Sequence, residues 1–249
     1  MILLEGSPGT FLAYTWSVAY LPRYEIICDG AHFHVTWQCH NKDWLLGWDW
    51  AKEGYYSLLL KYKDKYGIQI HAYNFMDNHP HLTGHLENRE NFSAFFRVVN
   101  SQFARIVNKQ LKRCGQVVMD RFRSPMIESD EHMLTVMAYV DLNQHRAGKV
   151  SHPRKNDWSS YRYYAYGRSD PLVTPSPSYM ALGRTPQERQ QEYRAIVQSL
   201  MEHRKLMNIS HIHFIGDPDW VLRKYRELCE RLGRKVTDVM VRRMMDPPG

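Results

Sequence analysis

The first part of the chain alternates between short stretches of β-forming residues and a longer amphipathic stretch. Residues 31–39 (AHFHVTWQC) alternate well enough to predict a strand. Residues 42–67 then predict a helix that ends at Gly67. Two further strands are predicted, over IQIHAYNFM and, after a turn-like DNH, over HPHLTGHL.

Two longer helices are predicted further along the chain. The first begins at Asn91, whose side chain can cap it, carries apolar residues at helical spacing and ends at Gly115. A short strand-like segment, QVVMDRFRSPMIE, precedes the second helix, which begins after Ser129 and ends at Gly148. The order strand, helix, strand, strand, helix, strand, helix predicts an α+β fold, an antiparallel sheet with helices packed on one face.

The composition changes after about residue 150, where aromatic and arginine residues give way to a stretch rich in proline and serine. Thr185 to Glu188 then form a capping box for a helix, and Asp217 begins another. We therefore expect a domain over residues 1–165, a linker or strap over 166–184, and a helical C-terminal extension over 185–249. The sequence leaves open whether this extension folds over the domain or stands apart.

The composition favours a polyanionic partner. The 249 residues contain 33 Lys and Arg against 26 Asp and Glu, a formal charge of +7, which favours nucleic acid first and an anionic membrane second. The simpler explanation of the charge is a basic soluble protein without such a partner. A hydrophobic fraction of 43% is ample for a packed core.

The cysteines and the apolar runs exclude several classes of protein. The four cysteines lie far apart without a C-x-x-C pair, which argues against a zinc ribbon and a disulfide scaffold. No apolar run reaches about 18 residues, so no membrane span is expected. The N-terminus has no basic region of the signal-peptide kind. We expect a cytoplasmic protein with free thiols.

Histidine pairs with one residue between them are the first candidate chemistry. Two histidines at positions i and i+2 of a strand face the same side, so their imidazoles can converge on one divalent ion. Three such pairs occur: His32 and His34, His79 and His81, and His211 and His213. Spacing alone does not choose among them, because a buried, hydrogen-bonded histidine explains any one of them.

Context favours the second pair. His79 and His81 come at the end of a predicted β-hairpin, and a helix with Tyr139 and Asn143 follows. Those two residues are four apart and share a helical face, about 5–6 Å apart at Cβ. A tyrosine hydroxyl can attack phosphorus when a metal polarises the phosphate, and an amide oxygen suits Mg²⁺ or Mn²⁺. The structural alternatives are a core tyrosine and an asparagine that bonds to backbone.

Several motifs together resemble one family. NFMDNHPHL resembles the M-P-N-H-x-H-L element of the HUH single-tyrosine transposases, and AYVDLNQHRAGKV resembles their Y-I-x-L-N-P-V-R-A-G-L-V helix. FHVTWQC, DRFRSPMI and WSSYRYY match further elements in the family's order. The match covers about residues 24–166 and is most similar to the REP-associated tyrosine transposase (IS200-like) branch.

The resemblance implies a ferredoxin-like sheet that carries His79 and His81, with Tyr139 on a facing helix. It implies that Tyr139 attacks a scissile DNA phosphate to form a 5′-phosphotyrosine link and a free 3′-hydroxyl. Mg²⁺ or Mn²⁺ would be held by His79, His81 and Asn143. The implied substrate is single-stranded DNA next to a hairpin, and the implied protein is a monomer or a homodimer.

Basic and aromatic side chains supply candidate DNA contacts, because rings can stack on bases while guanidinium groups meet phosphates. The candidates are Arg121, Arg123, Arg146, Trp158, Tyr161 and Arg162. Surface ion pairs and a strap that covers the core are the alternatives for them.

The chain departs from the family pattern at three places. Pro80 stands between the histidines, which suits a strand edge or a bulge. Asp77 replaces the usual proline, and Gln144 with His145 replaces Pro-Val, so Gln144 is a rival third ligand. Two other functions stay open: a non-catalytic DNA-binding regulator, and a nuclease whose metal-activated water makes Tyr139 structural.

Overall fold

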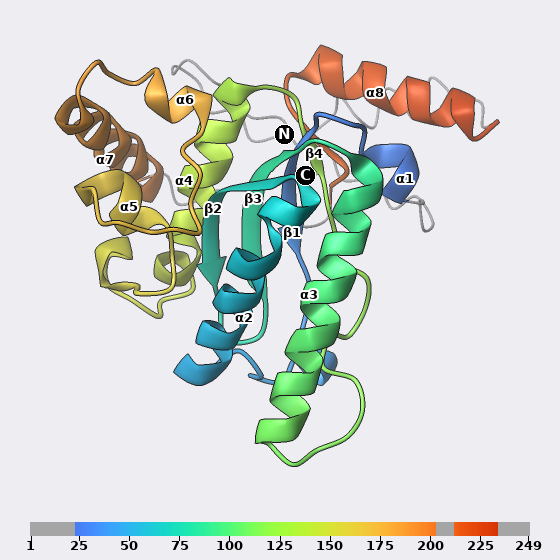
Figure 1. Cartoon of the computed structure of the whole chain (residues 1–249). Coiled ribbons are helices and arrows are strands. Elements are labelled where there is room, and N and C mark those ends of the chain that lie inside the picture. Colours follow the sequence, from blue (N-terminus) through green and yellow to red (C-terminus); the bar gives the residue numbers. More distant parts are fainter. Residues whose placement is uncertain (1–22, 203–211, 234–249) are drawn as a thin grey trace.

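The computed structural model describes residues 23–202 and 212–233 (Figure 1). The elements of the N-terminal part are α1 (Arg23–Ile26), β1 (His32–Thr36), α2 (Asp49–Tyr62), β2 (Ile68–Phe75), β3 (Pro80–Leu86), α3 (Arg89–Gln110), β4 (Met126–Ile127) and α4 (Asp130–Arg146). Then follow α5 (Tyr161–Tyr166), α6 (Pro177–Met180), α7 (Pro186–Glu202), β5 (Phe214–Ile215) and α8 (Pro218–Arg231). His211 of the third histidine pair lies outside the described residues.

The sheet has the strand order β2-β3-β1-β4-β5. Neighbouring strands are antiparallel except β4 and β5, which are parallel. The first four strands, with α2 after β1 and α3 after β3, have the connection and neighbour order of a ferredoxin-like fold. The predicted α+β class and ferredoxin-like sheet are thus confirmed.

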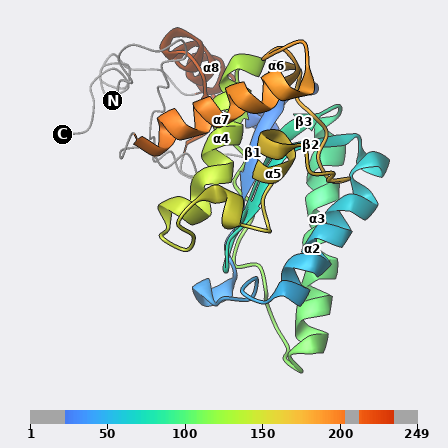
Figure 2. The same ribbon diagram turned by 90° about the vertical axis from the view of Figure 1, so that its left-hand side faces the viewer.

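Helices cover the two faces of this sheet differently. The pair α2 and α3 packs on one face, where the Phe33 ring lies 4.8 Å from that of Phe92. The expectation of helices on one face is correct for this pair. Helix α4 covers the other face, as the edge-on view in Figure 2 shows, and Thr83 Oγ1 of β3 lies 3.2 Å from Met133 Sδ of α4. Successive strand residues point to opposite faces, so each strand supplies side chains to the two layers.

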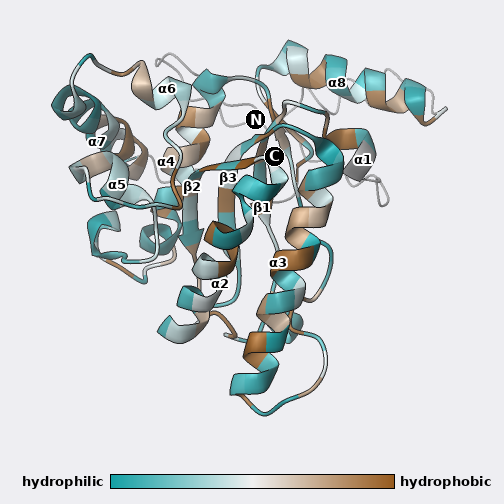
Figure 3. Cartoon of the chain, in the orientation of Figure 1, coloured by the Kyte–Doolittle hydropathy of each residue, from teal (hydrophilic) through white to brown (hydrophobic). Residues whose placement is uncertain are grey.

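Two predicted helix starts are displaced. Helix α2 begins at Asp49 instead of residue 42, and the residues before it form a loop. Asn88 caps α3 instead of Asn91, because its side chain accepts hydrogen bonds from the backbone N–H groups of Glu90 and Asn91 at 2.8 and 3.2 Å. Hydrophobic and hydrophilic residues alternate along α3 as its helical spacing predicts (Figure 3).

The C-terminal elements pack against the N-terminal part of the chain. Strand β5 extends the sheet beside β4, with Met126 opposite Phe214. The predicted capping box at the start of α7 is present, since Glu188 N donates to Thr185 Oγ1 at 3.2 Å and Thr185 N donates to the Glu188 carboxylate at 3.1 Å. Among the described residues, no helix is long and apolar enough to cross a membrane.

A buried carboxylate joins α4 to the C-terminal part. Asp141 is fully buried and accepts hydrogen bonds from Ser160 Oγ at 2.6 Å and Tyr193 OH, on α7, at 2.7 Å. Burial raises the pKa of the Asp141 carboxyl to about 7, against the opposing effect of these hydrogen bonds. Asp141 therefore holds α7 and the start of α5 against α4.

Replacing Asp141 with leucine should remove two hydrogen-bond acceptors at once. We expect Asp141→Leu to lower the free energy of unfolding by about 2–4 kcal/mol, because two buried hydroxyls lose their partner. Urea denaturation measures the change, with the exposed Asp64→Leu as the control. Equal stability of the two variants would contradict a supporting role for Asp141.

Gly84 of β3 and Gly54 of α2 form a matched pair for a second test. A Cβ on Gly84 would lie 1.9 Å from the carbonyl oxygen of Gln69, whereas one on Gly54 would make ordinary contacts with Ile106. We expect Gly84→Ala to destabilise the fold by about 2 kcal/mol or more through overpacking against backbone. Gly54→Ala should raise stability by up to about 1 kcal/mol through helix propensity. Thermal unfolding measures each change, and a destabilised Gly54→Ala would contradict the second expectation.

Candidate active site

The turn between β2 and β3 places the two candidate histidines. Met76 N donates to the His79 carbonyl oxygen at 3.0 Å, which closes the turn, and β3 begins at Pro80. Strand β1 pairs with β3 only from His81 onward, where His81 lies opposite Thr36. Pro80 is thus the first residue of its strand, a position that tolerates the missing N–H.

The rings of His79 and His81 lie side by side with centroids 4.9 Å apart. His79 Nδ1 lies 2.7 Å from the side-chain oxygen of Asn78, and His81 Nδ1 lies 3.1 Å from His34 Nε2. When each ring donates its proton from Nδ1, its Nε2 keeps a lone pair for a cation. The nitrogen donors that a divalent ion needs are therefore available on neighbouring rings.

Burial keeps these histidines neutral at neutral pH. It lowers the pKa of His34 to about 3 and holds the pKa of His81 well below its ordinary value. Burial also lowers the pKa of His79, against the opposing charge of Asp77. A neutral imidazole is the form that binds a metal, so the electrostatics of the cluster fit a divalent cation.

His34 is a member of this cluster that the sequence did not single out. Spacing placed His34 and His32 together as a pair, but the structure separates their surroundings: His32 lies 5.2 Å from the His85 ring, whereas His34 contacts His81. His34 pairs opposite Thr83, which makes it the diagonal neighbour of His81 on the same face. Only the register of β1 against β3 decides this contact.

Helix α4 brings the candidate tyrosine to the histidines. The Tyr139 ring centroid lies 6.4 Å from that of His81, and the Arg146 guanidinium lies 4.9 Å from the Tyr139 ring. One turn further on, Asn143 Nδ2 donates to the carbonyl oxygens of Tyr139 and Val140 at 3.1 and 3.2 Å. This orientation leaves the side-chain oxygen of Asn143 for another ligand.

The two other departures from the family pattern, at positions 144 and 77, bond to groups other than the histidines. Gln144 Nε2 donates to the Phe75 carbonyl oxygen at 2.9 Å, so this side chain ties α4 to the end of β2. Asp77 pairs with Lys52 and Lys149. Although burial alone would raise the pKa of the Asp77 carboxyl, these lysines lower it, so Asp77 is ionised and neutralised by them.

The predicted DNA-contact arginines lie at different places around the site. Arg121 and Arg123 are exposed, and Arg123 N donates to the Thr36 carbonyl oxygen at 2.8 Å, beside the end of β1. Arg146 is exposed beside Tyr139. Arg162 forms an ion pair with Asp157.

The two predicted aromatic contacts differ in exposure. Trp158 is half-buried, with its ring stacked 6.4 Å from that of Phe75 and its Nε1 donating to Asp49 at 2.8 Å. Tyr161 is only 2% exposed and packs 6.4 Å from the Tyr193 ring. Its ring therefore supports the packing of α5 on α7 and is not placed to stack on a base.

A second group of ligand-bearing side chains lies at the start of α4. Glu128, His132 and Asp217 bring ligand atoms within 4.8 Å of one another, with His132 Nε2 3.4 Å from Asp217 and His132 Nδ1 3.8 Å from Glu128. The group joins the start of α8 to β4 and α4. The sequence did not point to it, because Asp217 is distant in the chain from the other two.

Comparison with known proteins finds one matching family and a similar fold. Residues 28–143 match the family described as "Transposase IS200 like". The fold is similar to a solved structure titled "Structure of the REP associates tyrosine transposase bound to a REP hairpin", with a TM-score of 0.50 and 18% sequence identity over 64% of this chain and 93% of that one. A search of curated proteins finds no significant match. Residues 28–143, which contain the histidine turn, Tyr139 and Asn143, are therefore similar to the IS200-like transposase family.

Proposed function

We propose that the protein is a metal-dependent DNA strand transferase that cleaves and rejoins single-stranded DNA through a covalent 5′-phosphotyrosine on Tyr139. The observation that carries this proposal is the contact of the Tyr139 ring with His81, which itself stands beside His79. A nucleophile and a pair of neutral imidazoles are thus next to each other on facing elements.

In the proposed reaction, the Tyr139 oxygen forms a bond to phosphorus and the bond from phosphorus to the 3′-oxygen breaks. The tyrosine loses its proton, and the departing 3′-oxygen gains one. The new link is again a phosphodiester, so a 3′-hydroxyl can reverse the step and rejoin the strands. Arg146, whose guanidinium lies 4.9 Å from the Tyr139 ring, would stabilise negative charge that develops on the phosphate.

His79, His81 and Asn143 are the residues that would hold Mg²⁺ or Mn²⁺, with two nitrogens and one amide oxygen as ligands. When bound, the ion supplies Lewis-acid polarisation of the scissile phosphate. The hydrogen bond from Gln144 to Phe75 supports Asn143 over Gln144 as the third ligand. Contact between Tyr139 and His81 of one chain supports attack within a single subunit.

The proposed substrate is single-stranded DNA that carries a hairpin. The formal charge of +7 and the exposed Arg121, Arg123 and Arg146 favour a polyanion. The similar solved structure is bound, by its title, to a REP hairpin.

Loss of the Tyr139 hydroxyl should abolish covalent capture of DNA. With Mn²⁺ and a labelled single-stranded hairpin DNA, the protein should form an adduct that resists denaturation on a gel. We expect no adduct with Tyr139→Phe, because the ring stays but the nucleophile is gone, and an unchanged adduct with Tyr166→Phe, an exposed tyrosine of α5.

Other outcomes of this assay contradict the proposal in distinct ways. Cleavage that survives in Tyr139→Phe would identify a nuclease whose nucleophile is water. DNA binding by the unaltered protein without cleavage, in the presence of Mn²⁺ or Mg²⁺, would identify a DNA-binding regulator.

His34 should support metal binding without being a ligand. We expect His34→Phe to weaken Mn²⁺ binding by about 10- to 100-fold, the usual effect of losing a group that orients a ligand histidine. Titration of free Mn²⁺ by electron paramagnetic resonance measures this, with His85→Phe, on the same face of β3, as the control. Equal affinities of the two variants would show that the contact from His34 to His81 does not serve the metal.

A further inference from the structure

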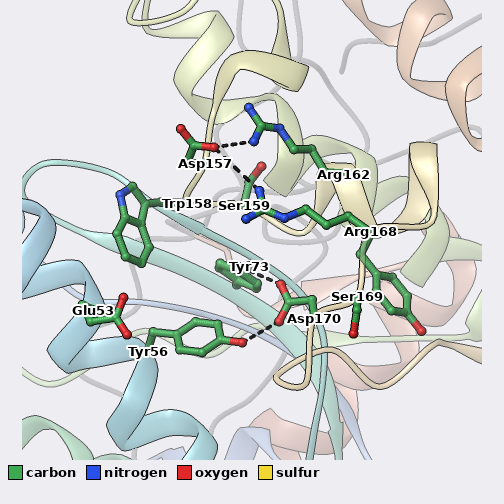
Figure 4. Close-up of a pocket in the computed structure, with 11 residues that line it drawn as sticks. Glu53, Tyr56, Tyr73, Asp157, Trp158, Ser159, Arg162, Arg168, Ser169 and Asp170 are labelled. Atoms are coloured by element: carbon green, nitrogen blue, oxygen red, sulfur yellow. Dashed lines mark hydrogen bonds and ion pairs between the residues drawn. The ribbon is translucent and has the colours of Figure 1, made fainter.

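A cavity of about 270 Å³ lies between α2 and the segment 157–170, beside strand β2 (Figure 4). Its lining includes Tyr56, Tyr73, Trp158, Ser159, Arg162 and Arg168. This volume is just below the range of about 300–1,000 Å³ that is usual for small-molecule sites. The cavity therefore suits a ligand no larger than one nucleotide.

The cavity and the histidines lie on opposite faces of the sheet, at the edge formed by β2. Asn74, the neighbour of the lining residue Tyr73, turns its side chain to α4, whereas the Tyr73 ring packs with Tyr56 of α2. Successive residues of β2 thus face the candidate active site and the cavity. A strand of DNA that passed from Tyr139 around this edge of the sheet would meet the cavity.

Exposed tryptophans lie between the two sites. Trp44 is 64% exposed, lies under the Lys149 ammonium at 4.4 Å, and precedes Leu46, whose N–H donates to the Asp77 carbonyl oxygen in the histidine turn. Trp48 and Trp50 then stack with centroids 5.7 Å apart, and Asp49 between them accepts the hydrogen bond from Trp158. A discontinuous series of rings thus leads from the turn to the cavity wall.

The lining is built to accept hydrogen bonds from a flat ligand. Tyr56 OH and Tyr73 OH donate to Asp170 at 2.7 and 2.8 Å, so their oxygens keep lone pairs for another donor. Ser159 is 5% exposed, and its hydroxyl has no hydrogen-bond partner within the described part of the chain. Because this oxygen has almost no solvent-accessible surface, the acceptors for a ligand are the two tyrosine oxygens.

Charged side chains make the interior of the cavity acidic, whereas an arginine lies at its rim. Glu53, Asp157 and Asp170 outnumber the two arginines of the lining, which disfavours a phosphate inside the cavity. Arg168 pairs with Asp157 at 3.7 Å, and their side chains are 61% and 66% exposed. Such exposed pairs contribute little, so the guanidinium of Arg168 can turn to a phosphate at the rim.

We propose that this cavity binds one unstacked base of the single-stranded DNA, between aromatic rings that include Trp158, with a neighbouring phosphate at Arg168. The proposal rests on single-stranded DNA as the substrate and adds a second point of contact outside the reacting centre. Bases stack on aromatic side chains without regard to sequence, and the N–H groups of a base suit the acceptors of the lining.

Ser169→Trp tests the proposal, because Ser169 is exposed at the edge of the cavity and a large ring there would fill it. The probes are a labelled hairpin oligodeoxynucleotide with a single-stranded tail and a set of versions that each lack one base of the tail. Binding is measured by fluorescence anisotropy in EDTA, so that the metal site does not contribute. The control is Ser101→Trp, an exposed serine of α3.

We expect one tail position at which loss of the base weakens binding to the unaltered protein and to Ser101→Trp by about tenfold. Loss of that base should leave binding to Ser169→Trp unchanged, since its cavity is already filled. A base whose loss costs the same in all three proteins, or no sensitive position at all, would overturn the proposal.

Arg168→Gln gives an independent measurement that leaves the cavity open. We expect it to weaken binding of the intact probe several-fold at low salt and to reduce the salt dependence by about one ion. Unchanged salt dependence would overturn the phosphate contact. Because these assays need no cleavage, they stay separate from the fate of Tyr139: an adduct without a sensitive tail position refutes only the cavity, and a sensitive position without an adduct refutes only the proposed chemistry.

Discussion

The position of α4 over the sheet depends on one buried amide. Asn74 Nδ2, in the edge strand β2, donates to the carbonyl oxygens of Val140 and Asp141 at 2.8 and 3.2 Å, and Asn156 Nδ2 donates in turn to the Asn74 side-chain oxygen at 3.2 Å. These bonds lie in a fully buried place, where an unpaired amide would be costly. They fix both the height and the rotation of α4, and so they determine that Tyr139 meets His81.

The same helix is also held by groups that come much later in the chain. Tyr193 of α7 and Ser160 at the start of α5 donate to Asp141, and Asp217 at the start of α8 pairs with His132. The C-terminal elements therefore support the candidate nucleophile through α4, although none of these groups contacts Tyr139 in the interactions described. A helix that is bonded on two sides loses little further freedom when it reacts, which suits a nucleophile that has to be aligned with a phosphorus atom.

Burial has a chemical consequence at the histidine turn. An exposed His79 and His81 would titrate near neutral pH, but low solvent access keeps them uncharged and in the form that a cation needs. The charge of Asp77 opposes this effect at His79 without overcoming it, and Asp77 is itself paired with Lys52 and Lys149. Asp77, which stands where the resembled motif has a proline, is thus paired with two lysines.

The periodicity of the chain predicted most strands and helices and the α+β class, because side-chain spacing along one element depends only on local geometry. The ferredoxin-like order of the strands was implied by the family resemblance. Hairpin context and the family resemblance pointed to His79 and His81, and helical spacing placed Tyr139 and Asn143 on one face of a helix. The exact start of α3 could not be predicted in this way. Asn88 and Asn91 are equally good N-cap residues by type, and the path of the chain after β3 decides that Asn88 is the cap. Contacts between segments that are distant in the chain could not be predicted from the sequence.

His34 contacts His81 because of the strand register, and Tyr161 is buried against α7. Asp217 pairs with His132 across 85 residues. The cavity beside Trp158 forms only where α2 and the segment 157–170 come together. Each depends on how elements dock, which is decided by the summed packing of the whole core and not by any one stretch of residues.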